Sequence, residues 1–221
     1  MIARHERVVL DLGTGDGRAV LRRARREPTT LVVGLDADAA TLRDSSRRAD
    51  RKPPKGGLPN ALFLVGSAEE LPGPLTGRVS LLTVVLPWGS LLRGVVAEHG
   101  AMICRLSETL APDGELELLL SVRPADRLQS LPMLDASAIA RMLAGYEQVG
   151  LLVAEARPAT DRDVDRLSSS WARRLGVPTR RPAWLLRFRR FAEPVMGEGA
   201  SVSADRRRRG GVTAKLMEKT G

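Results

Sequence analysis

Two carboxylates and a group of glycines occur at spacings that could hold a nucleoside. The stretch VVLDLGTGDG ends an apolar run with Asp11, Gly13, Gly15 and Gly17. Glycines in such a loop let the backbone approach a ligand closely, and a carboxylate before them can accept a charge-assisted hydrogen bond from an ammonium group. The dinucleotide fingerprint needs a further glycine where Arg18 stands. The loop therefore favours S-adenosylmethionine over a dinucleotide.

A second carboxylate, Asp36, ends the next apolar run, TLVVGLD. At the tip of a strand, its two oxygens match the vicinal hydroxyls of a ribose, which predicts nucleoside binding. Asp36 could instead cap the helix that follows, a frequent role of aspartate. The motif GSAEELP, after the third apolar run, would supply adenine contacts through Ala68 and Glu69. Loop and carboxylates together predict an S-adenosylmethionine site.

Two of the three tryptophans stand where they could contact a flat ligand. Trp88 follows a predicted strand in LPWGS, and Trp171 lies in SSSWARRL, three residues before Arg174 on the same helical face. Either ring could simply pack in the core, which is the commoner role of tryptophan. If the helix overhangs the cofactor site, the two rings could grip a planar base. Leu86 stands where methylases of exocyclic amines carry a polar residue, so an acceptor for an amine is missing.

The elements that must position these residues alternate along the chain. Short apolar runs alternate with segments of helical period, which is typical of an α/β, Rossmann-like fold. Seven strands are expected in a mostly parallel sheet, at residues 7–15, 30–38, 61–66, 78–86, 115–122, 151–159 and 182–191. About six helices are expected on both faces of this sheet, one of them at 161–176 and one ending at the turn-forming residues 112–114.

Composition bounds the class of protein. The 221 residues are 43% apolar and 28% charged, and residues 1–192 are expected to form a single domain followed by a disordered basic tail at 193–221. The only cysteine, Cys104, excludes an intramolecular disulfide and a zinc cysteine cluster, and no metal is expected. No apolar run approaches the roughly 20 residues of a membrane span, so the expected location is cytoplasmic.

The net charge of +9 is carried mostly by arginine. The guanidinium group suits phosphate oxygens and stacks on bases, so nucleic acid is the expected partner. A genome that encodes its surface charges as arginine is the alternative.

The motifs DLGTGDGR, KPPKGGLPN, AEELP, LPWGSLL and SSSWARRL together resemble the aminoglycoside-resistance 16S rRNA (adenine(1408)-N(1))-methyltransferases of the kanamycin and apramycin (Kam/Npm) type. The resemblance runs from about residue 8 to residue 175. It implies a class I S-adenosylmethionine-dependent methyltransferase that methylates N1 of adenine 1408 of 16S rRNA in the 30S subunit, and a flipped adenine stacked between Trp88 and Trp171. It also implies that the cofactor site includes Val85, Leu86, Pro87, Trp88, Gly89, Ser90, Ser169 and Ser170. Family members usually carry an N-terminal extension before the first strand, so either the start site of this sequence is misassigned or part of the docking surface is absent.

The predicted partner is the 30S subunit, bound by a monomer. The basic residues expected to contact its RNA are Arg48, Arg51, Lys52, Lys55, Arg174 and Arg181. They would read phosphate position and shape rather than base sequence. Two other hypotheses stay open: a class I methyltransferase for another target, such as tRNA, and a non-catalytic RNA-binding relative.

Overall fold

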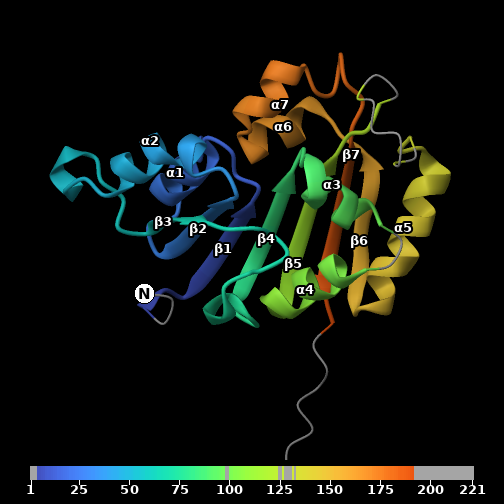
Figure 1. Cartoon of the computed structure of the whole chain (residues 1–221), viewed down its shortest axis with the longest axis horizontal. Coiled ribbons are helices and arrows are strands. Elements are labelled where there is room, and N and C mark those ends of the chain that lie inside the picture. The colour runs from blue at the N-terminus through green and yellow to red at the C-terminus, as the bar shows by residue number, and fades with distance from the viewer. Residues whose placement is uncertain (1–3, 98–99, 124–125, 127–130, 132, 192–221) are drawn as a thin grey trace, which may run out of the picture.

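A computed structural model describes residues 4–97, 100–123, 126, 131 and 133–191 of the chain. Within them, seven strands form one sheet in the spatial order β3-β2-β1-β4-β5-β7-β6 (Figure 1). The strands are β1 Arg7–Leu12, β2 Thr30–Asp36, β3 Ala61–Val65, β4 Val79–Val85, β5 Leu110–Leu120, β6 Leu151–Pro158 and β7 Trp184–Arg190. Strand β7 pairs antiparallel with β5 and β6, and the other neighbours are parallel. The prediction of a seven-stranded, mostly parallel sheet is confirmed.

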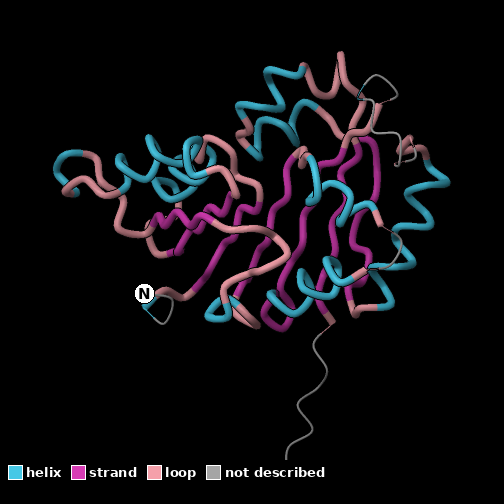
Figure 2. Tube along the Cα trace, in the orientation of Figure 1, coloured by secondary structure: helices cyan, strands magenta, loops and turns pink. Residues whose placement is uncertain are grey.

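Helices cover both faces of the sheet, because neighbouring residues of a strand point to opposite sides. The helices are α1 Arg18–Arg26, α2 Ala39–Ala49, α3 Gly89–Val96, α4 Ala101–Thr109, α5 Ala136–Gln148, α6 Asp161–Leu167 and α7 Ser170–Leu175, with 3-10 turns η2 Pro53–Lys55 and η3 Gly73–Leu75. In β1, Leu10 joins the core cluster that includes α3, α4 and α5, whereas Val9 joins a cluster with α1. A third cluster of buried side chains holds α6 and α7 against β5 and β7. The Cα trace shows helices and loops lying on both faces of the strands (Figure 2). The predicted tail at 193–221 lies outside the described residues.

The turn-forming residues Pro112, Asp113 and Gly114 lie inside strand β5 and not in the loop expected there. Helix α4 ends earlier, at Thr109, and β5 starts at Leu110. The register to β4 shifts there, because Val79 faces Leu110 while Leu81 faces Glu115. Asp113 adopts a φ of +58°, which fits a bulge in the strand.

The helix predicted over 161–176 is two helices, α6 and α7, separated at Ser168. Ser168 has a φ of +55°, and Ser169 caps α7 by accepting a hydrogen bond of 3.1 Å from the Ala172 N–H. Serine side chains compete with helical backbone bonds in this way, so three of them in a row end one helix and start another. The break turns Trp171 toward the carboxyl end of the sheet.

Helix α6 is held on the sheet by an ion pair between a buried aspartate and a partly exposed arginine, which should contribute measurably to stability. Both oxygens of Asp163 accept hydrogen bonds from Arg157 of β6, at 2.7 and 3.0 Å, and Asp163 is 5% exposed. These bonds, together with those from Thr160, hold the pKa of Asp163 well below its ordinary value. Arg157 keeps a second carboxylate partner, Glu155, at 2.6 Å. We expect Asp163→Asn to lower the free energy of unfolding by about 1.5–3 kcal/mol at neutral pH, because the charge-assisted hydrogen bonds to the buried Asp163 carboxylate are lost.

The pH dependence of this loss has a definite sign. A carboxylate with a depressed native pKa stabilises the fold fully above its unfolded value, and the contribution is lost as the pH falls toward the native pKa. The wild type and Asp163→Asn should therefore differ less in free energy of unfolding below about pH 4, as measured by urea unfolding. Asp161→Asn, at an exposed position of the same helix, is the matched control and should change stability by less than about 0.5 kcal/mol. If the free energies of unfolding of the wild type and Asp163→Asn differed equally at every pH, the role of this ion pair would be contradicted.

Candidate functional site

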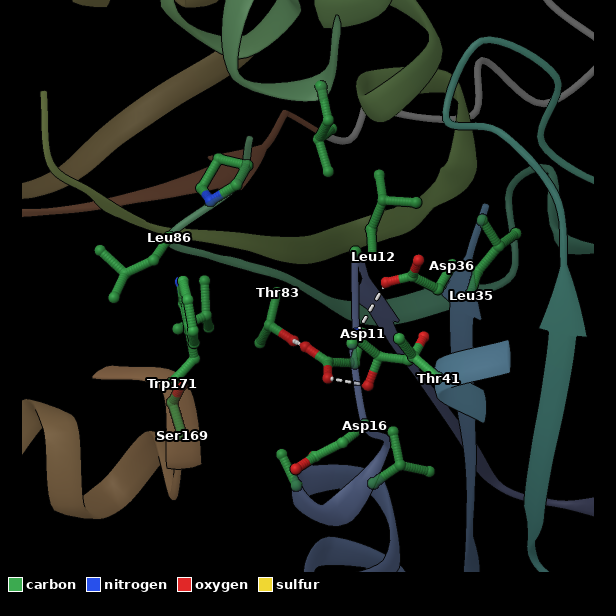
Figure 3. A pocket seen from close by; sticks show the side chains of 18 of the residues that line it. Asp11, Leu12, Asp16, Leu35, Asp36, Thr41, Thr83, Leu86, Ser169 and Trp171 are labelled. Carbon is green, nitrogen blue, oxygen red and sulfur yellow. Dashed lines mark hydrogen bonds between the residues drawn. The ribbon is translucent and has the colours of Figure 1, made fainter. Parts of the chain in front are cut away.

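An open cavity of about 500 Å³ lies at the carboxyl ends of β1, β2 and β4, with α7 at its rim (Figure 3). Its volume suits a ligand of nucleoside size. The structure brings together every predicted cofactor residue except Gly89, which begins α3 outside the lining. The predicted residues that line the cavity are Asp11, Gly13, Gly15, Asp36, Ala68, Glu69, Val85, Leu86, Pro87, Trp88, Ser90, Ser169, Ser170, Trp171 and Arg174.

The glycine loop takes a path that side chains would obstruct. Gly13 has a φ of +70°, and its N–H donates to the Leu35 carbonyl of the neighbouring strand at 2.8 Å. A Cβ atom on Gly13 would lie 2.8 Å from the Leu91 side chain, and one on Gly17 would lie 2.4 Å from the Phe63 ring. These two glycines therefore let the loop pack tightly at the floor of the cavity.

Asp11 is held at the tip of β1 by two threonine hydroxyls. Thr14 donates to one carboxylate oxygen at 2.6 Å, and Thr83 of β4 donates to the other at 2.7 Å (Figure 3). Burial raises the pKa of Asp11, and these two hydrogen bonds oppose that rise. A partly buried carboxylate with a fixed orientation is well suited to bind a ligand ammonium group. Sequence reasoning missed both threonines. Thr14 stands among the glycines of the loop, three residues after Asp11, and Thr83 becomes a neighbour of Asp11 only because β1 and β4 pair in the sheet.

Asp36 faces the cavity from the tip of β2 and does not cap α2. The residue that caps α2 is Asp38, whose side chain accepts from the Ala40 N–H at 2.8 Å. Asp36 accepts from the Gly15 N–H at 2.7 Å and from the Asp38 N–H at 3.0 Å, one on each oxygen. Each oxygen keeps a lone pair for a further donor, so the carboxylate can accept both hydroxyls of a ribose.

The segment after β3 forms another wall of the cavity. Ala68 is buried, and the exposed Glu69 accepts a hydrogen bond from the Ser90 hydroxyl at the start of α3. This bond, with one from the Glu69 backbone N–H, lowers the pKa of the Glu69 carboxyl. The contact joins the predicted adenine-binding segment to the segment after β4.

Backbone strain at the end of β4 directs the chain toward the cavity. Leu86 is buried and has a φ of +49°, a conformation that is unusual for any residue other than glycine. Its N–H still bonds to the Leu119 carbonyl of β5 at 2.8 Å. The reversal at Leu86 brings Pro87 and Trp88 to the lining.

Neither tryptophan of the predicted pair is sealed in the core. Trp88 is 44% exposed and Trp171 is 38% exposed, and both line the cavity. Each has a guanidinium carbon 5.7 Å from its ring centroid, that of Arg181 at Trp88 and that of Arg174 at Trp171. The third tryptophan, Trp184, donates to the Leu134 carbonyl at 2.8 Å at the start of β7.

Helix α7 is connected to the glycine loop and to α1 by the predicted site residue Ser170 and by two side chains that sequence reasoning did not single out, those of Asp16 and Arg22. The Ser170 hydroxyl donates to Asp16 at 3.1 Å, and Arg22 of α1 donates to the Ser168 carbonyl. These contacts set Trp171 close to the residues that would hold the cofactor.

The predicted RNA-binding residues fall into two groups. Arg48, Arg51, Lys52 and Lys55 are exposed at the end of α2 and in the turn that follows, and Arg174 is exposed on α7. The expectation of a surface arginine at position 181 is wrong. Arg181 is 4% exposed and forms an ion pair with Asp126, so its guanidinium group faces the protein.

The donor set fits S-adenosylmethionine. Asp11 offers a carboxylate to an ammonium group, Asp36 offers two oxygens to a ribose, and the wall at Ala68 is apolar. The rim carries two partly exposed indole rings, which can stack on a nucleobase.

Comparisons with known proteins agree with this chemistry. A family model described as NpmA, 16S rRNA (adenine(1408)-N(1))-methyltransferase, matches residues 1–189. A 16S rRNA (adenine(1408)-N(1))-methyltransferase from Streptoalloteichus hindustanus is 39% identical over 178 residues, which cover 78% of this chain and 82% of that protein.

Two crystal structures are also similar. A 16S rRNA (adenine(1408)-N(1))-methyltransferase mutant from Catenulisporales acidiphilia, with cosubstrate SAM, is 33% identical with a TM-score of 0.77, covering 88% of this chain and 91% of that one. The aminoglycoside resistance methyltransferase NpmB1 is 34% identical with a TM-score of 0.70, covering 86% and 89%. None of the helices in the described ranges has the length and apolar character that a membrane span requires.

Proposed function

The chain belongs to the 16S rRNA (adenine(1408)-N(1))-methyltransferase family, and on this premise we propose that it methylates N1 of adenine 1408 in the 30S subunit and thereby gives aminoglycoside resistance. It is an S-adenosylmethionine-dependent enzyme, as its named relatives are methyltransferases of this kind. The observation that supports the RNA target best is the pair of partly exposed tryptophans at the rim of a cavity with Asp11 and Asp36 at its floor.

The residues of the cavity floor bind and orient. S-adenosylmethionine, when bound, supplies a methyl group activated by a sulfonium centre. Asp11 would hold the ammonium group of the cofactor and Asp36 its ribose, while Ala68 and Glu69 would flank its adenine. The segment from Val85 to Ser90, together with Ser169 and Ser170, would form the wall toward the RNA. Fixed orientation is the main demand on these residues.

The target nitrogen needs no general base. Adenine N1 carries a lone pair in the plane of the ring, so no proton has to leave before methylation. This agrees with the apolar Leu86 at the end of β4, where an acceptor for an amine would otherwise stand. Removing the base from its stack costs a few kcal/mol, and stacking on Trp88 and Trp171 offsets about 1–3 kcal/mol per ring. Methylation leaves the base positively charged. Each indole face attracts this cation, which adds about 0.5–2 kcal/mol per ring.

Docking on the ribosomal RNA would use the exposed basic residues around the rim. These are Arg48, Arg51, Lys52, Lys55 and Arg174. Their phosphate contacts would position the enzyme without reading base sequence. We place this activity in a cytoplasmic monomer whose single domain spans residues 1–192.

Primer extension on 16S rRNA tests the proposal directly. Purified 30S subunits incubated with the protein and S-adenosylmethionine should give a new reverse-transcription stop caused by adenine 1408, with the cDNA ending one nucleotide 3′ of it, because N1 methylation blocks base pairing. Reactions without S-adenosylmethionine are the control. Bulk tRNA, offered under the same conditions, tests the alternative RNA target. A stop elsewhere, or methylation of tRNA alone, would overturn the assignment, and failure to bind S-adenosylmethionine in calorimetry would favour a non-catalytic relative.

A further inference from the structure

A buried arginine lies against the ring of Trp88. The guanidinium carbon of Arg181 is 5.7 Å from the centroid of the indole, within the range of a cation–π contact. Arg181 is 4% exposed, whereas Trp88 is 44% exposed. One side of the ring therefore contacts the protein, and the exposed part faces the cavity.

The guanidinium group is fixed by four hydrogen bonds. Asp126 accepts from both terminal nitrogens, at 2.9 and 2.5 Å, in the bidentate geometry that suits arginine and a carboxylate. Ser121, at the end of β5, accepts from the Arg181 Nε at 3.0 Å through its hydroxyl and from a terminal nitrogen at 3.2 Å through its carbonyl. The Ser121 hydroxyl in turn donates to the Pro182 carbonyl at 2.6 Å. Arg181 therefore has little freedom to reach a phosphate on the surface.

From this geometry we infer that Arg181 and Asp126 are positioning residues, which fix the plane of Trp88 so that only its cavity-facing side receives the target base. The inference deepens the proposed function and rests on it for its kinetic test. Arg181 acts through the ring and does not itself touch RNA.

The pairing with Asp126 also has an electrostatic consequence. An unpaired guanidinium group against one face of an indole would oppose the positive charge that methylation leaves on a base at the other face. Asp126 neutralises the guanidinium, so the ring keeps its attraction for the methylated base. Arg181 can therefore support the ring mechanically without weakening its chemical role.

Arg181→Met and its neighbour Arg180→Met form a matched pair for the test, because Arg180 is exposed on the same segment. With 30S subunits and S-adenosylmethionine, Arg181→Met should lower kcat about 10- to 100-fold, as expected for a misplaced aromatic ring. The KM for subunits and its dependence on salt should not change. Arg180→Met should leave kcat unchanged. Arg181→Lys should recover part of the activity of the wild type, and Asp126→Asn should lower kcat because it leaves the guanidinium unneutralised.

A readout without RNA separates this inference from the proposed function. In a Trp171→Phe, Trp184→Phe background, Trp88 is the only tryptophan, and its fluorescence anisotropy reports the motion of the ring. Adding Arg181→Met should shorten the anisotropy decay, while circular dichroism confirms the fold. If Arg181→Met does not fold, Asp126→Asn is measured in the same background. A raised KM with a weaker salt dependence and an unchanged kcat would show Arg181 to be an RNA contact, and an unchanged decay would remove the positioning role.

Discussion

Trp171→Ala should lower kcat/KM for methylation of 30S subunits by about 100-fold, and Trp88→Ala should do the same. Each change removes a stacking face for the flipped adenine, worth about 1–3 kcal/mol, and a surface that favours the methylated cation. Both rings are partly exposed at the rim, so alanine should leave the core and the fold intact. Expression of either variant in a sensitive bacterium should no longer give kanamycin and apramycin resistance.

The affinity for S-adenosylmethionine distinguishes a stacking role from a general loss of the site. Calorimetry should find the affinity of both alanine variants for S-adenosylmethionine within about threefold of the wild type, because Asp11 and Asp36 lie on β1 and β2, whereas Trp88 precedes α3 and Trp171 lies in α7. Trp171→Phe keeps an aromatic face and should retain most of the activity. Trp184→Phe is the control, since Trp184 lies at the start of β7 and does not line the cavity. Methylation that persists in both alanine variants would rule out a base held between these rings.

The sheet and the two acidic strand tips could be predicted from sequence because each depends on local pattern. Buried parallel strands are nearly continuous apolar runs, as β2 is, and Asp11 and Asp36 follow such runs directly. Tryptophan positions were informative because the chain has so few aromatic residues. The exposure of Trp88 and Trp171, in contrast, depends on how α6 and α7 pack on the sheet, which periodicity does not specify.

Contacts between distant segments could not be predicted. Thr83 meets Asp11 only because β4 lies beside β1 in the sheet. Arg181 appeared to belong to an exposed basic segment, and its burial depends on Asp126, a partner 55 residues away. Ser169 and Ser170 were predicted at the cofactor site and line the cavity, but the division of the helix at these serines was missed. Local propensity predicts where single helices and strands form, whereas the geometry of the site depends on how these elements pack against one another.

Asp11→Asn should weaken S-adenosylmethionine binding about 100-fold, yet it should not destabilise the free protein. The amide loses the charge-assisted hydrogen bond to the ammonium group of the cofactor. Burial raises the pKa of Asp11, so its ionised form is disfavoured in the folded state. At a pH above that raised pKa, the ionised carboxylate lowers the free energy of unfolding. This loss of stability disappears as the pH falls through the raised pKa, because the carboxylate takes up a proton. At neutral pH, the variant should therefore equal or exceed the wild type in thermal unfolding temperature.

Protonation of Asp11 should also change cofactor binding, where it lowers the affinity, whereas it raises the stability of the free protein. Binding to the wild type requires the ionised carboxylate, so affinity should fall as the pH drops through the raised pKa, whereas the weak binding of Asp11→Asn should lack this dependence. Asp38→Ala is the control, because Asp38 caps α2 beside the site and its loss should cost about 1 kcal/mol of stability with little effect on cofactor affinity. Asp11→Asn should thus lose cofactor affinity without losing stability, whereas Asp38→Ala should lose stability without losing cofactor affinity. An Asp11→Asn protein that bound the cofactor as the wild type does would mean that the ammonium group is held elsewhere in the cavity.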